Sequence, residues 1–99
     1  MHTTLSFDAS AFGTTASPAD AYRYAQGEAI THPGGFEVQL AQPLDFYAVT
    51  DHAVLLGLIN EAADTSTPFS QYALAKPYHN INESVGGGLL DLANRSKVF

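Results

Sequence analysis

The chain has 99 residues, so its length allows one domain at most. Four Lys and Arg against ten Asp and Glu give a net charge of −6, and only 14% of the residues are charged. An acidic chain lacks the clustered cations that neutralise nucleic-acid phosphates, so we expect no nucleic-acid partner. The lack of Cys excludes disulfides and thiolate metal sites. No apolar run approaches the roughly 20 residues of a membrane span, so we expect no membrane partner either.

The first predicted element is a helix over residues 17–26. Ser17 is a candidate N-cap, Pro18 suits the first helical position, and Asp20 falls three residues after the cap. This spacing is typical of a capping box followed by an N-terminal proline. Gly27 is a natural C-terminal cap because glycine adopts the left-handed conformation without steric cost. The residues before this helix are expected to form a polar loop.

A β-hairpin is predicted next. Residues 28–31 and 36–40 flank a His-Pro-Gly-Gly turn, and apolar residues alternate with polar ones in the second segment. The spacing favours two short antiparallel strands, and we expect His32 of the turn to be solvated.

A short apolar run over residues 44–49 predicts a buried strand of a parallel sheet. Polar residues, including Asp51 and His52, follow it directly. Parallel strands with helical crossovers carry their chemistry at the carboxyl ends of the strands. The sequence therefore places Asp51 and His52 where a functional site is expected.

The second half of the chain is predicted to be helical. A helix over residues 53–63 carries one apolar stripe, and Thr-Pro at 67–68 opens a shorter helix that ends near residue 75. Residues 77–88 are expected to form a loop, followed by a last helix over 89–96. The stripe of the first of these helices comprises Leu55, Leu58 and Ile59.

Four residues are candidates for chemistry: His2, Asp8, Asp51 and His52. Imidazole nitrogen and carboxylate oxygen together suit Zn, Mn or Fe. Asp51 and His52 are adjacent and point to opposite faces if both are extended, so one is expected to be a ligand and the other an orienting residue. Other interpretations stay open from the residues alone. His2 also fits a frayed terminus, Asp8 a turn or cap, and Asp51 a cap of the following helix.

Several stretches together resemble a bacterial family catalogued as a domain of unknown function, which is similar to a branch of the polymerase-and-histidinol-phosphatase (PHP) superfamily. The Thr-Asp-His sequence after an apolar run is moderately specific, and the Asp-Ala-Tyr-Arg sequence upstream makes the combination more so. The resembling stretches are residues 2–9, Phe12-Gly13, residues 18–24, Gly27-Glu28 and residues 43–53.

The resemblance implies an α/β fold, a distorted (β/α)7 barrel with metal ions at the carboxyl ends of its strands, and hydrolysis of phosphate esters. It implies that His2 is the second His of a His-x-His motif, with Met1 in the middle position. It further implies that Asp8 faces a metal and that His52 is the ligand of the second motif. Asp51 is expected to contact and orient the ligands without binding the metal itself.

The later motifs of that superfamily have no counterpart in the chain. The resemblance therefore predicts that residues 1–99 are a single partial domain, the N-terminal part of a PHP-like barrel truncated at both ends, with a small β-hairpin insertion. We expect such a fragment to be inactive alone. Divalent ions (Zn, Mn or Fe) and a small-molecule ester substrate are expected in a full-length relative. For the fragment alone, the resemblance also allows a metal site that stays empty. The alternative is a non-catalytic metal-binding or interaction fragment without independent function.

Overall fold

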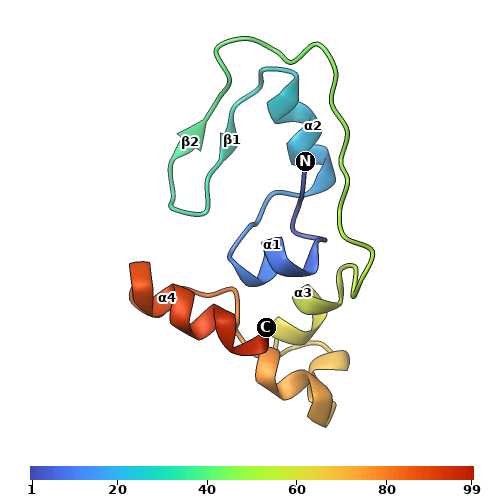
Figure 1. The fold of residues 1–99 in the computed structure, drawn as a ribbon, viewed down its shortest axis with the longest axis vertical. Coiled ribbons are helices and arrows are strands. Elements are labelled where there is room, and N and C mark those ends of the chain that lie inside the picture. The colour runs from blue at the N-terminus through green and yellow to red at the C-terminus, as the bar shows by residue number, and fades with distance from the viewer.

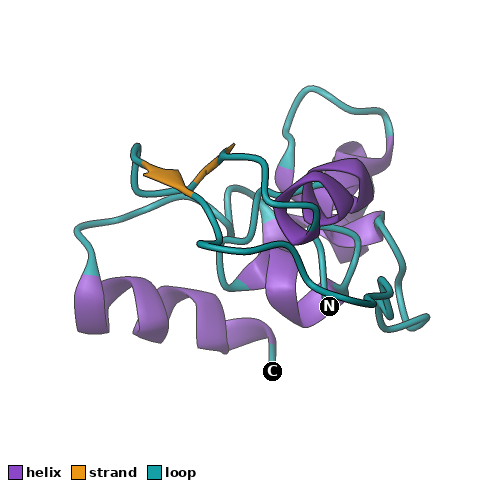
Figure 2. Cartoon of the chain, turned by 90° about the horizontal axis from the view of Figure 1, so that it is seen from above, coloured by secondary structure: helices purple, strands orange, loops and turns teal.

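The computed structural model describes residues 1–99 as an elongated molecule of 45 × 28 × 23 Å, with α2 and the hairpin at one end and α3 and α4 at the other (Figure 1). Helices and loops make up most of the chain, and the two strands are short (Figure 2). The elements in chain order are α1 (Phe7–Ala11), α2 (Pro18–Ala25), β1 (Ile30–Thr31), β2 (Glu37–Val38), α3 (Leu58–Ala63), the 3-10 helices η1 (Phe69–Gln71) and η2 (Ala73–Tyr78), α4 (Gly88–Arg95) and the 3-10 helix η3 (Ser96–Val98).

The structure confirms the predicted start of α2. The Ser17 side chain accepts a hydrogen bond from the backbone N–H of Asp20, and the Asp20 carboxylate accepts one from the Ser17 N–H at 2.9 Å. Gly27 has a φ of +92° and ends the helix, as expected. The buried face carries Ala21 and Ala25.

The hairpin is also confirmed, although its strands are shorter than predicted. β1 and β2 pair antiparallel, with Ile30 opposite Val38, and they form the only sheet. Residues 32–35 make the turn, and His32 is exposed there.

The prediction of a buried parallel strand over residues 44–49 is wrong. These residues form no strand, and the side chains of Leu44 and Phe46 are 46% and 90% exposed. The segment instead runs along one edge of the molecule, between the hairpin and α3 (Figure 1). An apolar run becomes a strand only where neighbouring strands satisfy its backbone groups, and residues 1–99 supply almost none. The expected partial barrel is accordingly absent from residues 1–99.

The helix predicted over residues 53–63 begins five residues late. Leu55 and Gly57 have φ angles of +53° and +73°, in the left-handed region, so a right-handed helix cannot run through them. Consequently Leu55 and Leu58 stay about 40% exposed, and the buried positions of α3 are Ile59, Ala62 and Ala63.

The remaining elements agree in part with the sequence. The helix predicted after Thr67-Pro68 is replaced by the 3-10 helices η1 and η2, whereas α4 lies within one residue of its predicted bounds. The helix α1 was not predicted. The longest helices have eight residues each, and none has the length and apolar character to cross a membrane.

The core lies where α3 meets the segment after η2. Ile59, Ala63 and Ile81 form its buried centre, each 3% exposed, and Phe7, Tyr78 and Val98 pack around it. Through Phe7 this core fixes α1 against α3, and α1 begins one residue before Asp8.

Candidate metal centre

Three of the predicted site residues lie together. His2, Asp8 and His52 each offer a ligand atom, and these atoms all lie within 4.8 Å of one another. Nδ1 of His52 is 3.1 Å from Oδ1 of Asp8, and the rings of His2 and His52 meet edge to face with centroids 4.4 Å apart. The structure thus brings together one side chain from the start of the chain, one from α1 and one from the loop that follows residues 44–49.

Backbone hydrogen bonds explain how His2 reaches His52. The amino group of Met1 donates to the carbonyl oxygen of Ala48 at 2.8 Å, and the N–H of Thr50 donates to the carbonyl oxygen of Met1 at 2.7 Å. This pattern is that of a parallel ladder in which Met1 lies beside Val49. The two segments run in the same direction there, so the residues that follow Met1 and those that follow Val49 lie close together.

Asp51 links the same two segments through its carboxylate. Oδ1 accepts a hydrogen bond from the N–H of Thr3 at 2.5 Å, and Oδ2 accepts one from the Thr3 hydroxyl at 2.6 Å. Burial raises the pKa of Asp51, but hydrogen bonds from Thr3 and Ser6 outweigh it, so the pKa lies below its usual value. Both carboxylate oxygens are therefore engaged in holding the segment that carries His2.

Sequence reasoning missed two residues that hold the cluster. Oγ of Ser6 lies 2.8 Å from the backbone N of His52 and 3.1 Å from Nδ1 of His2. The Asn60 side chain donates to the carbonyl oxygen of Thr4 at 2.8 Å and accepts from the hydroxyls of Thr4 and Ser10 at 3.2 and 2.5 Å. Asn60 directly follows the apolar Ile59 in the predicted helix, and a polar residue next to the buried stripe is a signal that could have indicated its role.

Asp8 is a carboxylate anion at neutral pH. Slight burial raises the pKa of Asp8. Hydrogen bonds from the backbone N–H of Ala9 and from His52, together with the charge of His52, lower the pKa by more than burial raises it. The net effect is a pKa below the usual value. One carboxylate and two imidazoles form a donor set that is common for Zn and for non-haem Fe.

The donor atoms lie close enough for one ion after small side-chain rotations. Tetrahedral coordination with bonds of about 2.0–2.2 Å places ligand atoms roughly 3.3–3.6 Å apart. The pair formed by Asp8 and His52 is already at 3.1 Å, and no pair of ligand atoms exceeds 4.8 Å. His2 and His52 are exposed, so rotation about their side-chain bonds meets little resistance. The residues present therefore fit a divalent ion with three protein ligands.

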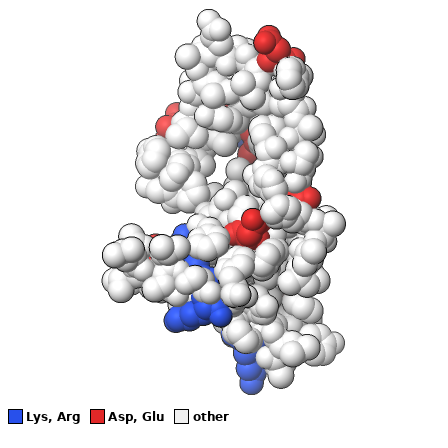
Figure 3. All heavy atoms as spheres, viewed as in Figure 1, with Lys and Arg blue, Asp and Glu red and all other residues white.

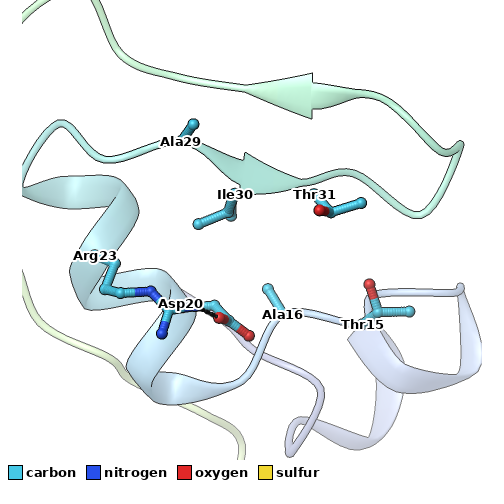
Figure 4. A pocket seen from close by; sticks show the side chains of 7 residues that line it. All are labelled: Thr15, Ala16, Asp20, Arg23, Ala29, Ile30 and Thr31. Atoms are coloured by element: carbon cyan, nitrogen blue, oxygen red, sulfur yellow. Dashed lines mark hydrogen bonds and ion pairs between the residues drawn. The ribbon is translucent and has the colours of Figure 1, made fainter.

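The other histidines and the pockets lie elsewhere. His32 accepts a hydrogen bond from the N–H of Gly34 within its own turn, and His79 contacts the carbonyl oxygen of Ser70. A pocket of about 270 Å³ lies between the hairpin and the start of α2, where Asp20 and Arg23 pair with each other (Figure 4). None of the pockets is lined by His2, Asp8 or His52, whose cluster is open to solvent.

Charged side chains are sparse on the surface. Most atoms on the face drawn in Figure 3 are neither acidic nor basic, in keeping with the low share of charged residues. That no nucleic acid binds the chain stays a prediction from its composition.

The comparisons with known proteins identify a family and no individual relative. The sequence profile described as "Protein of unknown function (DUF3604)" matches residues 1–99, which is the whole chain. No curated protein and no solved structure matches the chain. The match agrees with the expectation of a domain-of-unknown-function family, and the chain belongs to the DUF3604 family.

Proposed function

We propose that the chain binds one divalent ion through His2, Asp8 and His52, and that this site serves a metal-dependent hydrolase acting on phosphate esters or related esters. The single observation that carries the proposal is the convergence of the three ligand atoms within 4.8 Å. Two of these residues are 44 positions apart in the chain and still share a hydrogen bond.

The donor set is of the kind found in catalytic rather than structural sites. Catalytic zinc sites use three protein ligands and leave one position open, whereas structural sites close the shell with four. Both histidines are exposed and Asp8 is partly exposed, so a substrate could approach the ion. When bound, a divalent ion supplies an activated water nucleophile and stabilises developing charge on ester oxygens.

The chain's own residues would hold and orient such an ion. His2, Asp8 and His52 would provide the ligand atoms, and Asp51 would keep His2 in place by holding Thr3. Outer partners of this kind typically change metal affinity or activity by about 10–100-fold when removed.

The relation to the PHP superfamily is part of the same proposal. The parallel hydrogen-bond pattern between Met1 and residues 48–50 supports it, because that pattern places His2 and His52 at the same ends of neighbouring segments. In a barrel of parallel strands, ligands at strand carboxyl ends converge in this way.

The alternative is a metal-binding chain without catalytic activity. It is favoured by the lack of any pocket at the cluster, since ligand sites in enzymes are usually concave. Metal binding is common to both functions, so hydrolysis has to be measured separately.

The first experiment measures zinc affinity by competition with a chelating dye, using the wild-type chain, His52→Ala and His32→Ala. We expect tight binding of one ion by the wild type and by His32→Ala, and a loss of binding in His52→Ala. The His32 variant is a matched control because it removes an exposed histidine that lies outside the cluster. Equal affinities in all three proteins would contradict the proposed site.

The second experiment measures hydrolysis of an aryl phosphate ester with Zn or Mn. It uses a longer DUF3604 protein with the same Thr-Asp-His sequence, and its variant with that His replaced by Ala. Metal-dependent turnover that the substitution abolishes would support the hydrolase. Metal binding without turnover of phosphate or related esters would favour the non-catalytic alternative.

A further inference from the structure

A second cavity lies beside the one drawn in Figure 4, between the hairpin and the segment that joins α1 to α2. Its volume is about 400 Å³, and Figure 3 shows the molecule hollowed on this side of the hairpin. Volumes of roughly 300–1,000 Å³ are usual for sites that bind small molecules. The cavity therefore has room for a small ligand. The residues that it shares with its neighbour are Thr15, Ala16, Ile30 and Thr31.

The charge of this cavity is opposite to that of the chain. Arg95 of α4 is the only Lys, Arg, Asp or Glu among its lining residues, whereas the chain as a whole has a net charge of −6. The carboxylate of Asp91 lies 3.8 Å from the Arg95 guanidinium, but it accepts hydrogen bonds from Ser84, Val85 and Gly87. The Arg95 side chain is 16% exposed, so water screens its charge only in part. The cavity therefore favours an anion.

The Arg95 guanidinium is held in place and still has donors to spare. Nη1 donates to the carbonyl oxygen of Phe12 at 2.6 Å, and Nη2 donates to that of Asn82 at 3.2 Å. A guanidinium has five N–H groups, and Nε of Arg95 is buried without a hydrogen-bond partner. A Cβ at Gly13 would lie 2.6 Å from Nη1, so only glycine allows this close approach. A planar guanidinium with unused N–H groups matches the geometry of a carboxylate.

The remaining walls combine hydroxyls with apolar side chains. Thr14, Thr15 and Thr31 line the cavity, and their hydroxyls make no hydrogen bond within the chain. Ile30 of β1 lies opposite Val38 of β2, so the two side chains share one face of the hairpin. Both belong to the lining. A ligand that fits these walls has a polar end and an apolar body.

We propose that this cavity binds a small monocarboxylate with an apolar body, whose carboxylate pairs with Arg95 and whose body lies against Ile30 and Val38. A single negative charge fits best, because one guanidinium with Asp91 nearby cannot balance two. None of His2, Asp8 and His52 lines the cavity, so the proposal does not rest on the proposed function.

The test follows the backbone amide signals of the full ¹⁵N-labelled chain by NMR at neutral pH. The chain is titrated with hexanoate, with 1-hexanol, which has the same apolar body without the charge, and with inorganic phosphate, which has charge without the body. We expect saturable shifts at residues 13–16 and 30–32 with hexanoate, and binding at least about tenfold weaker for the other two ligands. Equal affinities for hexanoate and 1-hexanol would overturn the role of Arg95. Phosphate that binds as tightly would overturn the apolar contact, and shifts confined to other residues would refute the site.

Variants provide the second readout. Arg95→Gln should bind hexanoate about tenfold more weakly than the wild type. Arg23→Gln is the matched control and should bind it unchanged, because Arg23 lines only the neighbouring cavity. Arg95 also ties α4 to Phe12, so Thr31→Val provides a variant that leaves these bonds in place and removes one hydroxyl. We expect Thr31→Val to weaken hexanoate binding about fivefold. Hexanoate affinities that neither Arg95→Gln nor Thr31→Val changes would contradict the proposal.

Discussion

Replacement of Asn60 by Ala should separate the N-terminal segment from α3. The Asn60 side chain makes three hydrogen bonds, one donated to the Thr4 carbonyl and two accepted from the hydroxyls of Thr4 and Ser10. A typical hydrogen bond contributes about 1 kcal/mol net, so three contribute about 3 kcal/mol. The loss is large against the roughly 5–15 kcal/mol of free energy that stabilises an ordinary domain.

Urea unfolding followed by circular dichroism measures this loss. With a denaturant dependence of about 1–3 kcal/mol per molar urea, the unfolding midpoint should fall by about 1–3 M. Asn94→Ala is the matched control, because the Asn94 side chain makes one exposed hydrogen bond, to Lys97. We expect the control to change stability by less than about 0.5 kcal/mol. Equal midpoints for the two variants would refute the role assigned to Asn60.

The remaining predictions concern a ligand, a helix cap and the surface. Asp8→Asn should weaken zinc binding more than Asp51→Asn does, because Asp8 offers an oxygen to the ion; a chelator competition in which Asp51→Asn has the larger effect would contradict the ligand assignment. Hydrogen bonds from the backbone and side chain of Ser17 hold the pKa of Asp20 below 3.8. The capping bonds therefore stabilise α2 fully above that pH and are lost as the pH falls through the lower pKa of the folded state, so below about pH 4 the unfolding midpoint of Asp20→Asn should depend less on pH than that of the wild type. Apolar side chains that are more than 80% exposed should make the folded chain bind a hydrophobic dye at neutral pH, and fluorescence no greater than that of a typical globular protein would argue against this surface. These side chains are Phe46, Leu74 and Leu89.

Elements fixed by neighbouring residues could be predicted from the sequence. The start of α2 depends on Ser17, Pro18 and Asp20, which interact within one turn. The hairpin depends on its turn and on local alternation. Such signals need no knowledge of distant parts of the chain, so reading the sequence in short windows detects them.

Elements that depend on distant partners could not be predicted in this way. The apolar run at residues 44–49 has the composition of a buried strand, but no strand pairs along its length: its backbone bonds only to Ala25 at one end and to Tyr22 and Met1 at the other. The late start of α3 depends on a left-handed Leu55, which no propensity favours. In both places the apolar pattern of the sequence was correctly recognised. The pattern could not show which distant segments would pack against these residues.

The candidate site was predictable to a similar degree. His2, Asp8 and His52 were named through a family resemblance, and the structure brings them together. Ser6 and Asn60 were missed because small polar residues have no periodic signature, and their partners lie on other segments. Their roles follow only from the distances that the fold creates.

The most direct test of the metal centre is X-ray absorption at the zinc edge of the zinc-loaded chain. We expect a shell of nitrogen and oxygen at about 2.0–2.2 Å, with outer scattering from two imidazole rings. In the double variant His2→Ala, His52→Ala the imidazole scattering should disappear. A shell of oxygen alone in the wild type, or imidazole scattering that the double variant retains, would contradict the site.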